Sequence, residues 1–144
     1  MKSKMEKKKN KLSIYIELTS LIKKQRIELN SMFALIENCS STSEERKAPV
    51  KPLELVASCE RVFQMVYNDA KERDLYNLKC KKEYYEIYYW LGGFEVSITI
   101  LQSTQGNRTY LHVMVYGEKK RGRTRKKLKQ ILEYYKQLLS DIIA

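Results

Sequence analysis

Histidine and cysteine are scarce in this sequence of 144 residues, which contains one His and three Cys. Cys39, Cys59 and Cys80 lie far apart, so the chain has no Cys-x-x-Cys pair of the kind that ligates zinc. An odd number of unpaired cysteines is typical of a reducing compartment, where each thiol acts as a small apolar side chain. The sequence therefore predicts no metal site, no cofactor and no disulfide framework.

Long hydrophobic runs are also lacking. No segment approaches the roughly 18 apolar residues that a transmembrane helix requires, and the first residues do not resemble a signal peptide. With 31% charged and 43% hydrophobic residues, the composition is typical of a globular domain with a modest core. We therefore expect a soluble intracellular protein, cytoplasmic or nuclear, without a transmembrane segment.

Acidic residues are few in the two segments where basic residues concentrate. Residues 117–129 contain eight Lys or Arg against one Glu, and residues 1–11 contain six Lys against one Glu. Positive charge that is segregated in this way indicates a polyanionic partner. The alternative is a solvated, flexible charge run or a localisation signal.

An amphipathic helix is expected directly after the second basic segment, because apolar residues recur every three or four positions from Leu128 to Ile142. Thr124 stands where an N-cap residue would accept a backbone N–H of the first turn. Such a helix N-terminus suits phosphate binding, although cations there oppose the helix dipole. The candidate nucleic-acid-binding residues are Lys119, Lys120, Arg121, Arg123, Thr124, Arg125, Lys126, Lys127 and Lys129.

The chain divides into a basic disordered arm, an N-terminal helix, a Ser-rich linker and a nucleic-acid-binding domain. The predicted bounds of these four segments are 1–11, 12–38, 39–51 and 52–144. The first helix of the domain is expected to begin at Pro52, since proline suits the first helical position, and to end near Asp74.

Three antiparallel strands are predicted next, over residues 83–91, 94–101 and 108–116. The Gly92-Gly93 pair between the first two strands is typical of a tight hairpin. Alternation predicts one buried face in the second and third strands: Phe94, Val96, Ile98, Ile100, Leu111, Val113 and Val115. The expected fold class is therefore α+β, an α-β-β-β-α domain with a three-stranded antiparallel sheet, preceded by an extra N-terminal helix.

The opposite face of the sheet would be rich in aromatic side chains: Tyr84, Tyr88, Trp90, Tyr110, His112, Met114 and Tyr116. It could stack bases as single-strand binders do, pack against the N-terminal helix, or form a dimer interface. No catalytic site is predicted. His112 has no nucleophile placed beside it by any motif, and Glu83 and Glu86 point to opposite faces of a strand. We therefore do not expect an enzyme.

The basic segment and the predicted order of elements resemble the double-stranded RNA-binding domain, over about residues 52–140. That family's signature, Gly-x-Gly-x-Ser-Lys-Lys-x-Ala-Lys, falls on residues 120–129, where Gly122, Thr124, Lys126 and Lys129 match or nearly match. The resemblance implies that Arg125, Lys126 and Lys129 contact phosphates that border the major groove of an A-form duplex.

The expected function is non-catalytic binding of nucleic acid, foremost structured or double-stranded RNA, with affinity that comes mainly from counterion release. One alternative is a protein-interaction or dimerisation module, similar in outline to RWD folds. In that case the N-terminal helix would bind a second copy or a protein partner. Another alternative is a domain that docks on anionic membrane surfaces, for which four to eight clustered Lys or Arg suffice.

Overall fold

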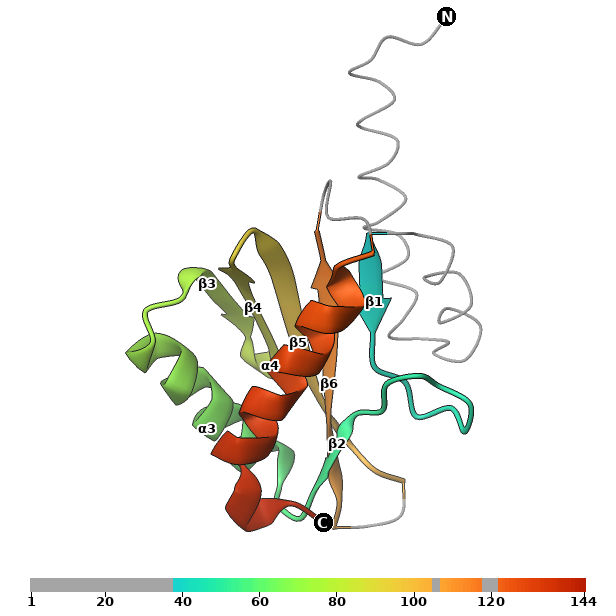
Figure 1. The fold of residues 1–144 in the computed structure, drawn as a ribbon. Helices are drawn as coiled ribbons and strands as arrows, with labels where there is room; N and C mark the ends of the chain where they lie inside the picture. The colour runs from blue at the N-terminus through green and yellow to red at the C-terminus, as the bar shows by residue number, and fades with distance from the viewer. Residues whose placement is uncertain (1–37, 105–106, 118–121) are drawn as a thin grey trace, which may run out of the picture. The chain divides into compact units, whose positions relative to one another are not determined.

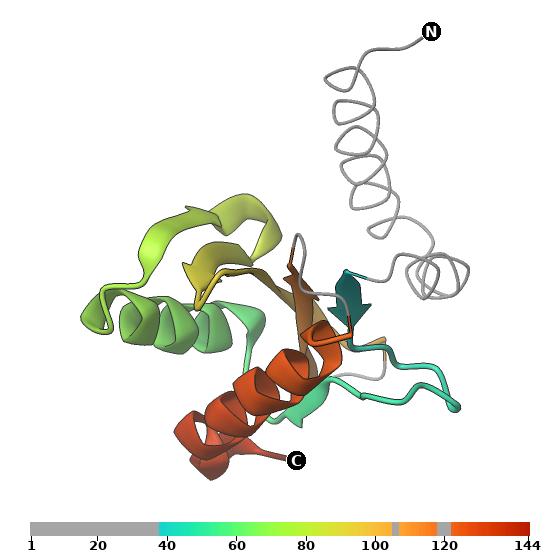
Figure 2. The ribbon, with the colours of Figure 1, turned by 45° about the horizontal axis from the view of Figure 1, so that its top comes forward.

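The computed structural model describes residues 38–104, 107–117 and 122–144, which form an antiparallel sheet with two helices on one face (Figure 1). The strands are β1 (Cys39–Ser41), β2 (Leu53–Leu55), β3 (Tyr76–Lys81), β4 (Glu86–Leu91), β5 (Phe94–Gln102) and β6 (Thr109–Tyr116). The other elements are the helices α3 (Cys59–Glu72) and α4 (Thr124–Leu138) and the short 3-10 turns η1 (Lys82–Tyr84) and η2 (Ser140–Ile142). A second view confirms that both helices lie on the same side of the sheet (Figure 2).

The sheet has the strand order β1-β6-β5-β4-β3, and β2 also pairs with β6. Ser41 lies opposite Met114 and Leu53 lies opposite Leu111, so β1 and β2 occupy one edge position in succession. The segment between them leaves the sheet and returns to it, and the Ser43 N–H donates to the Val50 carbonyl across its base at 3.0 Å. β3 forms the opposite edge of the sheet.

The hydrophobic core lies between the sheet and the two helices. The alternating apolar residues of β5 and β6 are buried as the sequence predicts: Phe94, Val96, Ile98, Ile100, Leu111, Val113 and Val115. The buried stripes of α3 and α4 complete the core: Val62, Phe63, Val66, Ala70, Leu128, Ile131, Leu132 and Tyr135. Because full burial of a large apolar side chain stabilises a fold by about 1.5–3 kcal/mol, these stripes fix both helices against the sheet.

Polar contacts between the elements add to this packing. The hydroxyls of Tyr89 on β4 and Tyr135 on α4 are 2.8 Å apart and buried. The Tyr134 hydroxyl of α4 donates to a carboxylate oxygen of Asp69 on α3 at 2.7 Å. Arg73 pairs with the same carboxylate at 3.1 Å and lies 4.1 Å from the centroid of the Tyr134 ring. These contacts fix α4, and with it the first turn of the helix, against both β4 and α3.

The three-stranded α-β-β-β-α fold expected from the sequence is wrong, because the sheet has six strands. Leu53–Leu55 pairs with β6 instead of following a helix start at Pro52. Helix α3 begins only at Cys59, after Ser58, whose side-chain oxygen accepts the Arg61 N–H at 3.2 Å. β1, β2 and β3 were not predicted from the sequence.

The strands β4, β5 and β6 are confirmed, with ends that shift by a few residues. β4 begins at Glu86 rather than at residue 83, because residues 82–84 form the turn η1. The hairpin at Gly92 and Gly93 is also confirmed, and these residues have φ angles of 59° and 82°. Positive φ at both positions is what a two-residue hairpin turn requires.

The segment predicted as a linker contributes β1 to the edge of the sheet. The predicted basic arm, and all of the predicted N-terminal helix except Asn38, lie outside the described residues.

Candidate nucleic-acid interface

Of the basic residues predicted to bind nucleic acid, those that the structure describes lie at the beginning of α4. Gly122 precedes the helix with a φ angle of 74°, Arg123 occupies the N-cap position, and the helix runs from Thr124. The basic side chains of this stretch are Arg123, Arg125, Lys126, Lys127 and Lys129, all exposed except Lys127, which is partly buried. The other three predicted basic residues, Lys119, Lys120 and Arg121, lie outside the described residues.

Thr124 does not have the position predicted for it. It is the first helical residue rather than the N-cap, and its side chain is 2% exposed. Its hydroxyl lies 2.7 Å from the hydroxyl of Ser40 on β1. Thr124 therefore attaches the first turn of α4 to the sheet edge, and its hydroxyl is not presented to a ligand.

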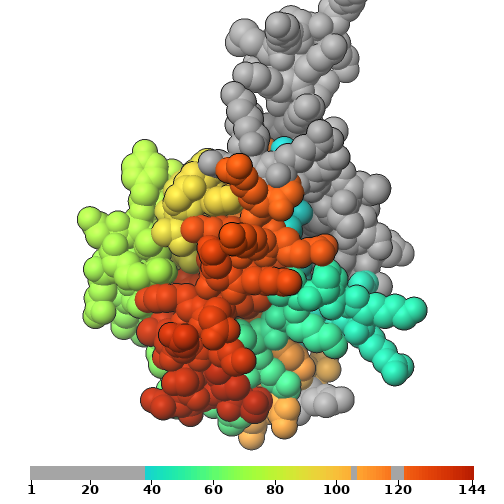
Figure 3. All heavy atoms as spheres, viewed as in Figure 1, coloured from blue at the N-terminus to red at the C-terminus, as the bar shows by residue number. Residues whose placement is uncertain are grey.

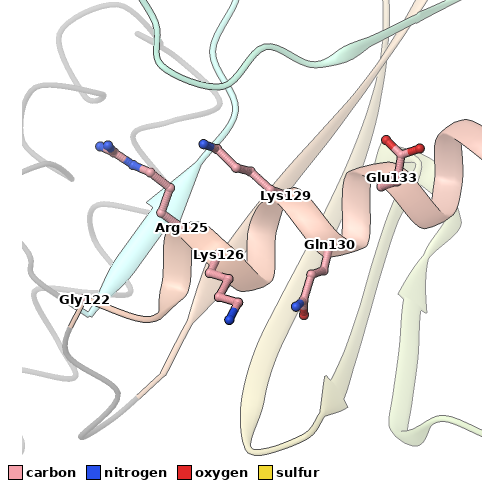
Figure 4. A pocket seen from close by; sticks show the side chains of 6 residues that line it. All are labelled: Gly122, Arg125, Lys126, Lys129, Gln130 and Glu133. Atoms are coloured by element: carbon pink, nitrogen blue, oxygen red, sulfur yellow. The ribbon is translucent and has the colours of Figure 1, made fainter.

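Three of the four exposed cations line a shallow, open depression on α4, the helix that faces the viewer in Figure 3. The depression is lined by Gly122, Arg125, Lys126, Lys129, Gln130 and Glu133. Figure 4 shows that Arg125 and Lys129, one helical turn apart, extend to the same side of the helix. Lys126 and Gln130 extend together to the other side. The first two turns thus present charged groups on both sides of one shallow surface.

These cations are not neutralised within the described part of the chain. No ion pair there involves Arg123, Arg125, Lys126, Lys127 or Lys129. The first turn of α4 also contains no acidic residue. Because the free N–H groups and the dipole of a helix N-terminus also attract anions, the backbone and the side chains favour the same kind of ligand.

Lys127 differs from its neighbours because it faces the sheet. Its ammonium nitrogen lies 5.7 Å from the centroid of the Phe94 ring, at the β4–β5 hairpin. A cation at this distance from an aromatic face is attracted by the ring. Lys127 therefore packs against the sheet, and the exposed cations among the described residues of this stretch are Arg123, Arg125, Lys126 and Lys129.

A histidine with polar neighbours lies on β6, and sequence reasoning missed these neighbours. One ring nitrogen of His112 is 3.0 Å from the Thr42 hydroxyl, and the other is 3.2 Å from a carboxylate oxygen of Glu44. The grouping resembles a hydroxyl–His–carboxylate arrangement. However, the Thr42 side chain is 5% exposed, and its oxygen accepts the Val113 N–H at 3.0 Å. A buried hydroxyl engaged in this way serves to attach the segment after β1 to β6.

Residues 38–104, 107–117 and 122–144 contain neither a metal site nor a membrane-spanning helix. No group of three or more His, Cys, Asp or Glu side chains there could hold a metal ion. Neither of the two helices in these ranges has the length and apolarity needed to cross a membrane. No protein family model, curated protein or solved structure matches this chain.

Proposed function

We propose that this chain is a non-catalytic nucleic-acid-binding protein that contacts phosphates through the start of α4. The observation that carries the proposal is the set of four exposed cations on the first turns of α4, which have no ion-pair partner among the described residues. Neutralising phosphates with such side chains releases condensed counterions, and this release drives binding.

Structured or double-stranded RNA is the first ligand to test, because the basic turn resembles that of the double-stranded RNA-binding domain. The predicted α-β-β-β-α topology no longer supports a duplex ligand, because the sheet has six strands. The β4–β5 connection is only the Gly92-Gly93 turn, which is too short to reach into a groove. The proposed contacts are therefore made to the phosphate backbone.

The test replaces Arg125, Lys126 and Lys129 by Ala together. These side chains are exposed and lie off the buried stripe of α4, so the unfolding midpoint should stay close to that of the wild type. The affinity for labelled RNA should fall. The slope of log K against log salt should shrink by about 0.7–0.9 for each lost phosphate contact.

A matched control replaces three exposed helical cations elsewhere, Arg61, Lys71 and Lys136, by Ala. The net charge falls by the same amount as in the first variant, so a site-specific effect separates from a general charge effect. Equal losses of affinity in the two variants, or unchanged affinity in the first, would contradict the proposal.

Competition between ligands then tests the ligand class. Duplex RNA, single-stranded RNA, DNA and anionic vesicles compete for the same sample at fixed salt. We expect nucleic acid to displace the labelled RNA more effectively than vesicles of equal phosphate concentration. The reverse order would favour docking on an anionic membrane surface, and the absence of binding to either would favour a protein partner.

A further inference from the structure

Exposed aromatic side chains gather on β3, η1 and β4, at one corner of the sheet. The large hydrophobic side chains that are exposed in the described residues are Val56, Tyr76, Tyr84 and Trp90. Tyr76, Tyr84 and Trp90 lie on β3, η1 and β4, respectively. Tyr76 is 76% exposed and Trp90 is 37% exposed. β3 is the edge strand at the far end of the sheet from β1, which adjoins α4 (Figure 1).

The pairing of β3 with β4 places Tyr76 and Trp90 side by side. They lie directly opposite each other in the antiparallel register. Residues in such a pair have Cβ atoms about 4.5–5.5 Å apart, on the same face of the sheet. Trp90 also lies opposite Glu95, whereas its neighbour Tyr89 faces the buried Val96. The Tyr76–Trp90 pair is therefore on the face away from the helices.

An irregularity in β3 brings two lysines to this same face. The register shifts between Tyr76 and Lys79, and Asn77 within the shift has a φ angle of 58°. After the shift, Lys79 lies opposite Tyr88 and Lys81 opposite Glu86. In a regular strand, Tyr76 and Lys79 would point to opposite faces, because side chains alternate. The bulge thus sets Lys79 and Lys81, both exposed, on the face that carries Tyr76 and Trp90.

The acidic residues of β4 and β5 on this face, Glu86 and Glu95, are buried and partly buried, respectively. Glu86 is 2% exposed, and its carboxylate accepts a hydrogen bond from the Tyr88 hydroxyl. Burial raises the pKa of Glu95, which is partly buried. Lys79 and Lys81 are exposed, so the two cations beside the aromatic pair are more accessible to a ligand than the buried Glu86 and the partly buried Glu95.

We propose that Tyr76, Trp90, Lys79 and Lys81 form a second binding surface, which takes unpaired bases of single-stranded nucleic acid. The proposal rests on the proposed function, because it assigns a ligand of the same class to a second site. Aromatic side chains that stack on bases, with cations that follow the backbone, are the elements of single-strand binding. Paired bases inside a duplex offer no free face to this surface, so it complements the phosphate contacts made by α4.

Trp90 makes the proposal directly measurable, since it is the only tryptophan in the sequence. Stacking of a base on its ring should quench its fluorescence. The probe is an oligouridylate of about ten nucleotides, a length within the range of known single-strand sites. We expect saturable quenching by this probe, and little quenching by a duplex RNA that the protein binds equally well in an anisotropy assay.

Tyr76→Ala tests the stacking platform without removing the fluorophore. Because its ring is 76% exposed, the folded state should persist. The quenching midpoint should move to a concentration about five- to 140-fold higher, the range that corresponds to the loss of one stacked base. The double variant Lys79→Ala/Lys81→Ala should also weaken quenching, more than the matched pair Arg61→Ala/Lys136→Ala. Unchanged midpoints in Tyr76→Ala would overturn the proposal.

The variant with Arg125, Lys126 and Lys129 replaced by Ala separates this proposal from the proposed function. It should lose affinity for duplex RNA and still show quenching by oligouridylate. If the wild type binds duplex RNA but shows no quenching, the second surface is refuted while the function of α4 stands. A blue shift of Trp90 emission with anionic vesicles, without quenching by oligouridylate, would also overturn the proposal in favour of membrane contact.

Discussion

The hydrogen bond between the hydroxyls of Tyr89 and Tyr135 gives a quantitative test of how α4 is held on the sheet. The two oxygens are 2.8 Å apart, and the side chains are 1% and 0% exposed. Removing one hydroxyl leaves the other buried without this partner, which costs about 1–3 kcal/mol, whereas removing both is close to neutral. We expect Tyr89→Phe and Tyr135→Phe each to lower the free energy of unfolding within this range. The double variant should lose less than the sum of the two.

The two single variants should differ in size because of Arg73. Burial raises the pKa of Tyr89, while its hydrogen bond to Tyr135 and the neighbouring Arg73 guanidinium lower it. In Tyr135→Phe, the Tyr89 oxygen keeps the neighbouring Arg73 guanidinium, whose positive charge favours that oxygen. In Tyr89→Phe, the Tyr135 hydroxyl loses the partner it has among the described residues. Tyr89→Phe should therefore be the more destabilising change.

Urea unfolding followed by circular dichroism measures the free energy of unfolding of the wild type, the two single variants and the double variant. The comparison requires that the free energy depend on urea concentration with the same slope in all four proteins. Tyr76→Phe serves as a control, because its ring is 76% exposed and its hydroxyl should contribute little to stability. Costs that simply add in the double variant would refute the pairing of the two hydroxyls. Equal single costs would refute the role given to Arg73.

Three further predictions concern the described residues. Iodoacetamide should modify the exposed Cys80 in the folded protein and spare the buried Cys39, because burial raises the pKa of the Cys39 thiol to about 12. Mass spectrometry of the labelled peptides measures the extent of modification at each cysteine. Gly122→Ala should lower the free energy of unfolding by about 1 kcal/mol, because the φ angle of 74° strains any other residue although no atom lies within 4 Å of an added Cβ. An unchanged urea midpoint would contradict this. The free energy of unfolding should fall as the pH rises from 9.0 to about 12, because the unfolded Cys39 thiol ionises there while the folded one stays protonated; urea titrations across this range measure it.

The parts of the fold that could be predicted from the sequence are those with a clear period. β5 alternates buried and half-buried residues along most of its length, and α4 repeats apolar residues every three or four positions. In both elements, one face lies against the core and the other faces outward. Apolar residues therefore recur in the sequence with the period of the strand or of the helix. The Gly92-Gly93 turn was predictable because positive φ favours glycine.

The edge strands could not be predicted for the opposite reason. β3 is exposed at five of its six positions, so it has no buried face to impose alternation. β1 and β2 are three residues long and are held by pairing with β6, which is distant in the sequence. Proline suits the first position of a helix, but the residues after Pro52 form the edge strand β2.

The candidate site on α4 was predictable in its charges and not in its geometry. The sequence indicates that cations gather where a helix begins, and the structure describes five of the eight basic residues proposed. That Thr124 bonds to Ser40, and that Lys127 faces Phe94, depends on segments that pack against α4. The proposed second binding surface depends on the bulge between Tyr76 and Lys79, because one inserted residue reverses which face every later side chain of the strand occupies.

The basic residues at the start of α4 oppose the helix dipole, and this unfavourable placement is the reason to propose a function for the first turns of the helix. A cation at a helix N-terminus opposes the dipole by about 0.3–1 kcal/mol, yet the first turn carries basic residues and no acidic one. The buried inner stripe and the bond between Thr124 and Ser40 hold the helix in place despite this cost. A surface shaped for stability alone would place Asp or Glu there. The position of the charges, more than their number, therefore supports the proposal that an anion binds at this end of α4.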